Sequence, residues 1–245
     1  MPNIKIENLS FAYKSKRHKK IKINVFDNLN INFDNASFNV ILGESGSGKT
    51  TLLKCIAGTL KYDGNILFSN VNINDIPTKY REISYIDQSL VLYPHLTIFE
   101  NIAFPLKNQK IKNEKITELV YDIAKKLKIY DCLMVLPKYI SIGQKQRACL
   151  AKALIKKSKI YLFDEPISNI DEKERVEIKL IIKEFVTRNK ATAIYVTHSI
   201  QEALSLGDKI FILEKGKVEL SGSPEKVYKS NNKLIVSFKK NDEKR

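Results

Sequence analysis

The feature that most constrains this chain is the glycine-rich segment Val-Ile-Leu-Gly-Glu-Ser-Gly-Ser-Gly-Lys-Thr-Thr-Leu-Leu at residues 40–53. Its centre fits the pattern G-x-x-x-x-G-K-[ST], between an apolar run typical of a strand and a pattern typical of a helix. Gly46 and Gly48 allow the backbone to curl, so that consecutive N–H groups point inward. A purely structural turn needs neither Lys49 nor the hydroxyl of Thr50. The segment therefore predicts a cradle for phosphate groups.

Two adjacent carboxylates end a second apolar strand, in Lys-Ile-Tyr-Leu-Phe-Asp-Glu-Pro at residues 159–166. Asp164 is suited to hold Mg²⁺ together with the Thr50 hydroxyl, and Glu165 is suited to orient or deprotonate a water molecule. Lys49 would bridge the β- and γ-phosphates of a nucleotide. The guanine-reading motif Asn-Lys-x-Asp is absent from the sequence, which argues against a GTPase. These residues predict a phosphate cradle, a metal holder and a base.

The order of apolar patterns predicts the fold class. Apolar runs bounded by turn residues indicate strands, and helical patterns lie between several of them. The expected strands are 4–9, 31–33, 38–42, 66–68, 83–86, 160–163, 193–196 and 210–213, and the expected helices are 49–57, 112–127, 144–156, 172–188 and 200–204. This order predicts an α/β chain with a mainly parallel sheet.

One main domain is expected at residues 1–238, followed by a charged tail at 239–245 that we expect to be frayed. Residues 89–157 have an almost wholly helical pattern, typical of a helical subdomain inserted in the α/β core. Pro94, Pro105 and Pro137 are expected to break this subdomain into pieces.

Composition narrows the class of protein. The 245 residues suffice for a sizeable core, and no apolar run approaches the roughly 18 residues that span a bilayer. The first residues lack the pattern of a signal peptide, so a cytoplasmic location is expected. Cys55, Cys132 and Cys149 have the spacing of neither a disulfide framework nor a zinc site.

The net charge of +15 suits nucleic acid, anionic lipid or acidic ligands and does not choose among them. The densest basic cluster, residues 14–22, is expected to be a solvated loop rather than a binding patch. Because lysine is abundant along the whole chain, the charge is weak support for any one partner.

With these motifs in this order, the chain resembles the ATP-binding cassette (ABC) family of transporter ATPases from about residue 4 to 238. The resemblance implies a P-loop NTPase cassette with a mainly parallel sheet core, an antiparallel β subdomain and an inserted helical subdomain. It also implies an enzyme that binds ATP and Mg²⁺ and hydrolyses ATP.

The resemblance implies roles for single residues. Tyr13 lies where family members stack an aromatic ring on adenine, and Gln88 resembles the glutamine that reaches the metal and the attacking water. His198, in Val-Thr-His-Ser, resembles the switch histidine, and Asp171 ends a segment similar to the D-loop. The implied site comprises catalytic Lys49, Gln88, Glu165 and His198, metal-binding Thr50, Gln88 and Asp164, and nucleotide-binding Tyr13, Gly43, Glu44, Ser45, Gly46, Ser47, Gly48, Lys49, Thr50, Thr51, Ser141, Gly143, Gln144 and Asp171.

The stretch Ile-Ser-Ile-Gly-Gln-Lys-Gln-Arg at residues 140–147 precedes a helical pattern. By itself it predicts a capped helix start, and such a start can also hold an anion. It resembles the family signature Leu-Ser-Gly-Gly-Gln-x-Gln-Arg, which covers the γ-phosphate held by the other subunit. The resemblance implies that Ser141 and the N–H of Gly143 contact a phosphate of a partner cassette. Ile142 replaces a glycine of the signature, and we expect retained hydrolysis with weaker closure of the dimer.

Residues 89–106 are similar to a stretch of importer cassettes for sugars, polyamines and related solutes. The resemblance implies a second cassette, transmembrane permease subunits and a solute-binding protein as partners, and a peripheral location at the cytoplasmic face of the membrane. In many such importers a regulatory β domain follows the cassette. This sequence stops after the cassette and its short charged tail, so control through such a domain is not expected. An exporter or division-type complex remains an alternative. So does a non-transport ABC ATPase on nucleic acid or ribosomes, although no nucleic acid partner is expected.

Overall fold

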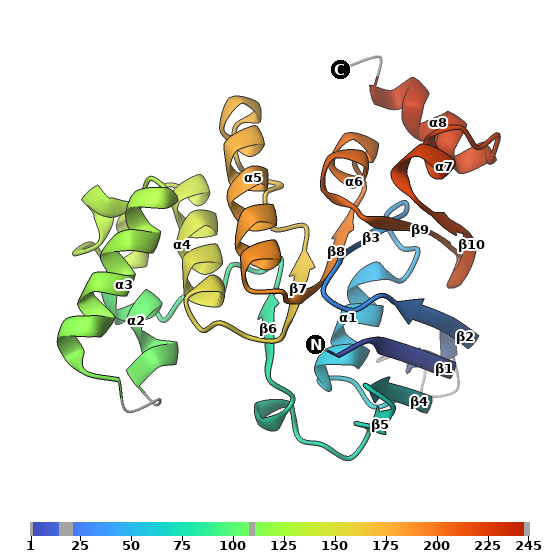
Figure 1. Ribbon diagram of the computed structural model, residues 1–245, viewed down its shortest axis with the longest axis horizontal. Coiled ribbons are helices and arrows are strands. Elements are labelled where there is room, and N and C mark those ends of the chain that lie inside the picture. The colour runs from blue at the N-terminus through green and yellow to red at the C-terminus, as the bar shows by residue number, and fades with distance from the viewer. Residues whose placement is uncertain (1, 15–21, 108–110, 243–245) are drawn as a thin grey trace.

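The structure is a computed structural model that describes residues 2–14, 22–107 and 111–242 (Figure 1). Its centre is a six-stranded sheet with the strand order β10-β9-β3-β8-β7-β6. The strands are β3 (Phe38–Leu42), β6 (Ile83–Ile86), β7 (Ile160–Asp164), β8 (Thr192–Thr197), β9 (Lys209–Glu214) and β10 (Lys217–Gly222). Only β10 pairs antiparallel with its neighbour within this sheet. The predicted α/β class with a mainly parallel sheet is confirmed.

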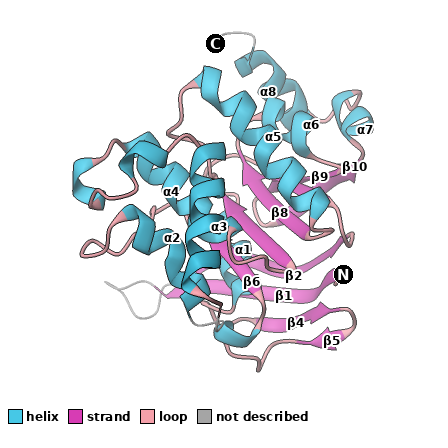
Figure 2. Ribbon diagram, turned by 60° about the vertical axis from the view of Figure 1, so that its left-hand side comes forward, coloured by secondary structure: helices cyan, strands magenta, loops and turns pink. Residues whose placement is uncertain are grey.

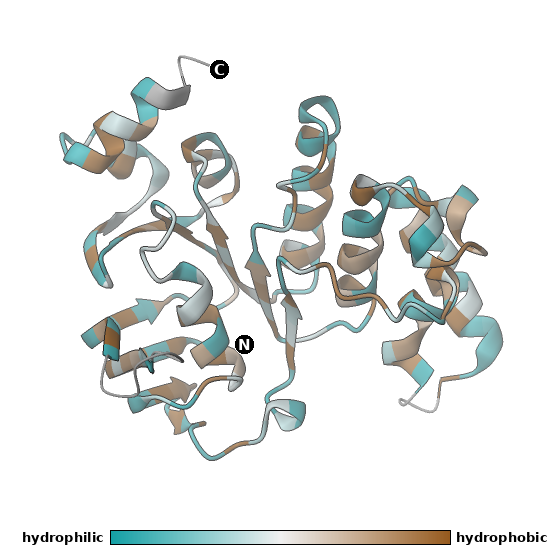
Figure 3. Cartoon of the chain, turned by 180° about the vertical axis from the view of Figure 1, so that it is seen from behind, coloured by the Kyte–Doolittle hydropathy of each residue, from teal (hydrophilic) through white to brown (hydrophobic). Residues whose placement is uncertain are grey.

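The central strands are covered on both faces. β3, β7 and β8 are buried along their whole length, as expected for continuous apolar strands of a parallel sheet. Their hydrophobic character stands out in Figure 3. Successive side chains point to opposite faces, so Val40 and Leu42 pack in one core cluster and Ile41 in the other.

A second, four-stranded sheet is antiparallel and has the order β2-β1-β4-β5 (Figure 2). Its strands are β1 (Ile4–Lys14), β2 (Lys22–Phe33), β4 (Asp63–Phe68) and β5 (Val71–Asn72). Side chains of β1, β2 and β4 share one core cluster with the helix α1 (Lys49–Ala57). The expected antiparallel β subdomain is therefore present, and α1 lies between it and the central sheet.

The helices α2 (Ile98–Lys107), α3 (Asn113–Lys126) and α4 (Ile142–Leu154) form a lobe beside the central sheet, on the left of Figure 1. Short 3₁₀ turns, η2 (Tyr130–Cys132) and η3 (Pro137–Tyr139), connect α3 to α4. This lobe lies within the stretch where a helical subdomain was expected, and its boundaries at 89 and 157 stay a prediction.

Pro105 does not break the lobe as predicted, because it lies inside α2. It is near the helix end, so its missing N–H removes a single bond of the helical ladder. The apolar face of α2, with Ile98, Ile102 and Leu106 buried, holds the helix in place despite this loss. Burial of that face therefore outweighs the local effect of the proline.

The remaining helices are η1 (Thr78–Tyr80), α5 (Glu172–Arg188), α6 (Ile200–Leu206), α7 (Pro224–Tyr228) and α8 (Lys233–Asp242). α8 runs across residue 239, so the first part of the expected tail is helical rather than frayed. The basic cluster at 14–22 lies, except for its two ends, outside the described residues. Among the helices of the described ranges, none has both the length and the apolar composition needed to cross a membrane.

Candidate functional site

The glycine-rich loop connects β3 to α1 and has the backbone that its sequence requires. Gly48 has a φ of 106°, and a Cβ there would lie 2.8 Å from the Phe26 ring. A Cβ at Gly43 would lie 2.4 Å from the carbonyl oxygen of Leu213. Both positions therefore exclude a side chain, one through its left-handed backbone and both through close approach.

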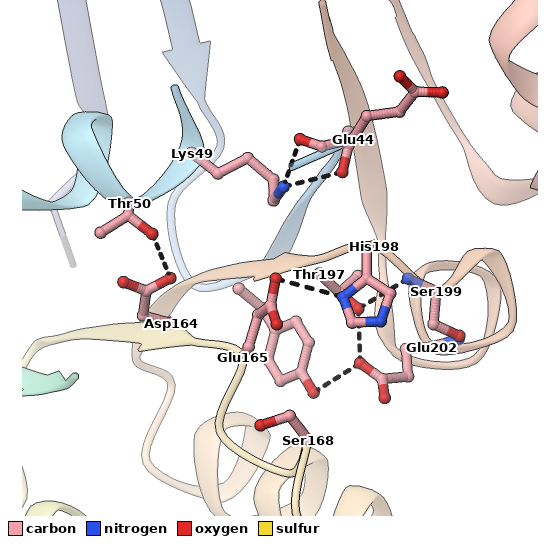
Figure 4. Close-up of polar contacts among 12 residues, drawn as sticks. Glu44, Lys49, Thr50, Asp164, Glu165, Ser168, Thr197, His198, Ser199 and Glu202 are labelled. Carbon is pink, nitrogen blue, oxygen red and sulfur yellow. Dashed lines mark hydrogen bonds and ion pairs between the residues drawn. The ribbon is translucent and has the colours of Figure 1, made fainter. Parts of the chain in front are cut away.

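Lys49 folds back across the loop that it follows (Figure 4). Its ammonium donates to the carbonyl oxygens of Gly43, at 2.8 Å, and Glu44, at 2.9 Å. Burial lowers the pKa of Lys49, whereas the carboxylates of Glu165, Asp164 and Glu44 oppose this shift. The hydroxyl of Ser47 is buried without a hydrogen-bond partner in the described structure. The loop thus presents a buried cation and an unused hydroxyl, which fits an anionic ligand.

Asp164, at the end of β7, meets two hydroxyl groups. Thr50 Oγ1 donates to one carboxylate oxygen at 2.9 Å, and the Tyr85 hydroxyl donates to the other at 3.2 Å. Asp164 is 1% exposed, and burial raises the pKa of its carboxyl group while these hydrogen bonds oppose the rise.

The side chains around Asp164 fit Mg²⁺. This ion prefers oxygen ligands and is commonly held by one or two carboxylates together with phosphate oxygens. Thr50 and Asp164 supply a hydroxyl and a carboxylate next to the phosphate loop. Within the described residues there is no cluster of three or more His, Cys, Asp or Glu suited to a metal.

Glu165 faces His198 across the ends of β7 and β8. His198 Nδ1 lies 3.2 Å from a carboxylate oxygen of Glu165 (Figure 4). This contact is the main cause that lowers the pKa of Glu165 and raises the pKa of His198, and burial opposes both shifts. The backbone of Glu165 is left-handed, with a φ of 49°, and its N–H donates to Val196 at 3.2 Å. A strained conformation therefore aims this carboxylate at the histidine.

Lys49, Thr50 and the Glu165–His198 pair line one cavity of about 540 Å³, and Asp164 is not among its lining residues. The cavity combines the phosphate loop, Glu165 after β7, His198 after β8 and the aromatic residue of β1. Its lining residues are Tyr13, Ile23, Val25, Ser45, Gly46, Gly48, Lys49, Thr50, Thr51, Gln88, Glu165 and His198. The hydroxyls of Tyr13 and Thr51 are 3.2 Å apart. The cavity has room for a phosphorylated ligand beside an exposed aromatic ring.

The residues 141–144 do not line this cavity. Ser141 is the N-cap of α4, where its side chain accepts from the N–H of Gln144 while the Gln144 side chain accepts from the N–H of Ser141. The capped helix start is therefore present. Ile142 is 59% exposed and begins the helix without a left-handed backbone, so its β-branch is accommodated without strain. Asp171, at the N-cap of α5, likewise does not line the cavity.

Three residues with contacts to the site were not singled out from the sequence. Tyr85 holds Asp164. Gln146 of α4 is buried, accepts from the N–H of Asn169 at 2.9 Å and donates to the carbonyl of Glu165 at 3.4 Å. Glu202 of α6 contacts residues of β8 next to His198. No motif in the sequence pointed to these three residues.

A comparison with known protein families finds that residues 26–168 match the model of the ABC transporter family. This match covers more than half of the chain. The chain belongs to the ABC transporter family. The predicted P-loop cassette fold is confirmed by a similar solved structure, which is titled a dimeric post-hydrolysis state of the ATP-binding cassette MJ0796 bound to ADP and Pi. The two share 29% identity, with a TM-score of 0.83, over 90% of this chain and 98% of that one.

Two curated relatives of this ABC protein carry transport names. The spermidine/putrescine import ATP-binding protein PotA of Mannheimia succiniciproducens is 35% identical over 96% of this chain and 62% of its own length. The glucose import ATP-binding protein GlcV of Saccharolobus solfataricus is 40% identical over 87% of this chain and 62% of its own length. The ABC chain therefore spans about three fifths of the length of these relatives.

Proposed function

We propose that this chain binds and hydrolyses ATP and thereby powers the import of a solute through separate membrane subunits. The observation that carries the proposal is the Glu165–His198 pair at 3.2 Å, facing a cavity that also contains the phosphate loop. Family membership and relatives named for import support it.

We propose roles for the residues in and next to the cavity. Lys49 is in reach of phosphate oxygens once it leaves the carbonyls of Gly43 and Glu44, and Tyr13 offers a ring face for the adenine. Thr50, Asp164 and Gln88 are the residues that would hold Mg²⁺, which supplies charge neutralisation at the phosphates.

Glu165 and His198 would position the attacking water molecule. Glu165 accepts a hydrogen bond from the water and orients it or takes its proton. His198, held against Glu165, fixes the orientation of that carboxylate and contacts the γ-phosphate. The reaction is an in-line transfer of the γ-phosphoryl group to water, so most of the catalysis comes from positioning and charge stabilisation.

The position of residues 141–144 outside the cavity lining gives the second part of the proposal. The start of α4 carries the positive end of a helix dipole and lies outside its own chain's cavity. We infer that a second cassette brings its own α4 start over this cavity, so that Ser141, Gly143 and Gln144 meet the phosphates in trans. Binding of ATP would close the dimer and hydrolysis would reopen it, which passes the energy to permease subunits as a change of shape.

The partners and the place in the cell follow from this arrangement. Permease subunits would provide the path across the bilayer, and a solute-binding protein would deliver the solute. The cassette would then work at the cytoplasmic face of the membrane as a peripheral subunit. The residues of the cavity do not identify the solute, because in this proposal the cavity binds the nucleotide.

The first test is the variant Glu165→Gln. It keeps the size of the side chain and removes the base, so turnover should fall by at least about 100-fold while ATP binding stays near that of the wild type. Phosphate release and binding of a fluorescent ATP analogue measure the two quantities. Undiminished hydrolysis would refute the assignment of Glu165.

The second test separates transport from the alternatives. ATP turnover should rise when the cassette is combined with membrane subunits purified with it. Stimulation by DNA or RNA in the absence of membrane protein would instead favour a non-transport ATPase. Inverted vesicles expose the cytoplasmic face, so ATP-driven uptake of the solute into them would indicate an exporter, whereas ATP-driven release of solute from their lumen would indicate an importer.

A further inference from the structure

A second network of polar contacts joins Thr197 and Ser199, the two neighbours of His198 in the chain, to Glu202 (Figure 4). Its centre is Glu202 of α6. One oxygen of the Glu202 carboxylate accepts from Thr197 Oγ1 at 2.7 Å and from the Tyr195 hydroxyl at 3.0 Å. Glu202 does not line the nucleotide cavity.

The same residue also reaches the other flank of His198. The N–H of Glu202 donates to Ser199 Oγ at 3.3 Å, and the N–H of Ser199 donates to Thr197 Oγ1 at 3.0 Å. Glu202 therefore holds the residue before His198 with its side chain and the residue after it with its backbone. The turn that carries His198 is fixed on both sides.

The anchor of this network is rigid. Tyr195 is fully buried in β8, and Thr197 is 2% exposed. Burial raises the pKa of Tyr195 well above its ordinary value, so the phenol stays a hydrogen-bond donor to Glu202. The carboxylate is thus connected directly to the central sheet.

We propose that Glu202 is a positioning residue that sets the place of the His198 ring and, through it, the orientation of Glu165. This inference rests on the proposed hydrolysis of ATP for its consequence in catalysis. The geometry of the clamp itself does not depend on that function. Without the Glu202 carboxylate, the turn would lose the contacts with Thr197 and Tyr195 and keep only the backbone contact with Ser199.

The His198 ring reports on this clamp directly. The groups that bear on its charge are Glu165 at the end of β7, Lys49 of α1 and Glu202 of α6. The hydrogen bond with Glu165 raises the pKa of His198 most, and the Glu202 charge adds to the rise. Loosening the turn should weaken the contact with Glu165 and lower this pKa.

The test compares Glu202→Gln with Thr197→Val. The valine keeps the shape of the threonine and the charge of Glu202 but removes the hydroxyl that links them. The chain has three histidines, His18, His95 and His198, so the His198 ring signals in ¹H–¹³C spectra can be assigned with His198→Gln. In the nucleotide-free protein, both variants should shift these signals and lower the pKa of His198.

The same variants should lower kcat by roughly 10-fold, because a small displacement of a catalytic group is costly. Their affinity for a fluorescent ATP analogue should change by less than about twofold, since a loss confined to the chemical step spares ground-state binding. Thr192→Val is the matched control. Thr192 is a buried threonine at the other end of β8, with hydrogen bonds to Pro2 and Ala36. It should affect stability and leave the His198 signals and kcat unchanged.

Unshifted His198 signals in both test variants would overturn the proposal. So would equal losses of kcat in Thr192→Val and Thr197→Val, which would mean a general effect on folding. If Glu202→Gln does not fold, Thr197→Val alone decides. If the wild type hydrolyses no ATP, the proposed function fails, and the spectra still test the clamp.

Discussion

At the scale of single residues, the cavity contains one pair of side chains that stabilise each other's charged forms. Glu165 and His198 form the pair that faces the phosphate loop. The hydrogen bond between them favours the ionised carboxylate and the protonated imidazole at the same time. The pair therefore stabilises the fold within a limited range of pH.

The sign of that effect differs at the two ends of the range. The lowered pKa of Glu165 adds stability above its ordinary value of 4.5, which is lost as pH falls through the lowered pKa. The raised pKa of His198 adds stability that is complete below its ordinary value of 6.5 and is lost as pH rises through the raised pKa. The full contribution is expected between these two ordinary values.

We therefore predict that His198→Gln destabilises the protein more at about pH 5.5 than at about pH 8.5. The difference in the free energy of unfolding should stay below about 1 kcal/mol, because the His198 side chain is 46% exposed and solvent screens the pair. Urea denaturation at the two pH values measures it. His95→Gln, which changes an exposed histidine outside the cavity, is the matched control. Equal destabilisation by His198→Gln at both pH values contradicts the ion pair.

At the scale of secondary-structure elements, α1 is fixed at both ends by different means. Its start is the glycine-rich loop, and its last carbonyls meet the guanidinium of Arg81. Arg81 donates to the carbonyls of Ile56, at 2.9 Å, and Cys55, at 3.4 Å. It also donates to those of Ile76 and Asn74, in the segment before its own 3₁₀ turn. A cation at a helix C-terminus is favoured by the helix dipole.

Replacing Arg81 by methionine should destabilise the fold by about 3 kcal/mol, because Arg81 is 6% exposed and its removal leaves buried carbonyls without donors. Arg81→Lys should recover only part of this loss, since a single ammonium does not reproduce the fork of donors. Denaturation by urea measures the free energies. Arg188→Met, at the exposed end of α5, is the control, and a loss in Arg81→Met no larger than in this control would refute the cap.

Elements with a strong local pattern could be predicted from the sequence. The boundaries of β3, β6, α1 and α5 agree with the predicted ranges. β1 and β2 were predicted too short, because register shifts in their pairing interrupt the period of two on which the prediction relied. α2 lies in the stretch 89–157 that was predicted to be mostly helical, but no separate helix was predicted there, since Pro105 argues against one and the burial that overrides it arises from tertiary packing.

The residues of the site also differ in how far the sequence predicts them. Its phosphate loop and acidic strand end are contiguous motifs, and the structure brings Gly46, Lys49, Gln88, Glu165 and His198 to one cavity as expected. Tyr85 and Gln146 act through contacts between distant segments, for which a single sequence carries no pattern. Glu202 contacts Thr197 only five residues away, but no sequence motif marks that contact. The roles of all these residues stay predictions until variants are measured.

At the scale of the whole molecule, the cavity and the start of α4 are separate surfaces of one chain. Residues 141–144 are outside the cavity lining, yet α4 is connected to the acidic strand end through Gln146. A symmetric dimer would make each chain supply a cradle to one site and an α4 start to the other. Two sites would then form between two chains.

This arrangement predicts that two inactive variants restore activity when mixed. Lys49→Ala removes the cradle lysine. Gly143→Asp places a negative charge near the start of α4, where it is favourable to the helix and repels a phosphate. A Cβ at position 143 would lie 3.5 Å from the carbonyl oxygen of Asn169, which is an ordinary van der Waals contact. The fold should therefore tolerate the change.

In a mixed dimer, the intact cradle comes from the Gly143→Asp chain and the intact α4 start from the Lys49→Ala chain. One site of that dimer is complete and the other lacks both parts. Because half of randomly formed dimers are mixed, an equal mixture should recover about a quarter of wild-type ATP turnover if the two sites act independently. Asn113→Asp adds the same charge at the first residue of α3 and should be active alone. A mixture no more active than its separate components would mean that the cradle and the α4 start of one site do not come from different chains.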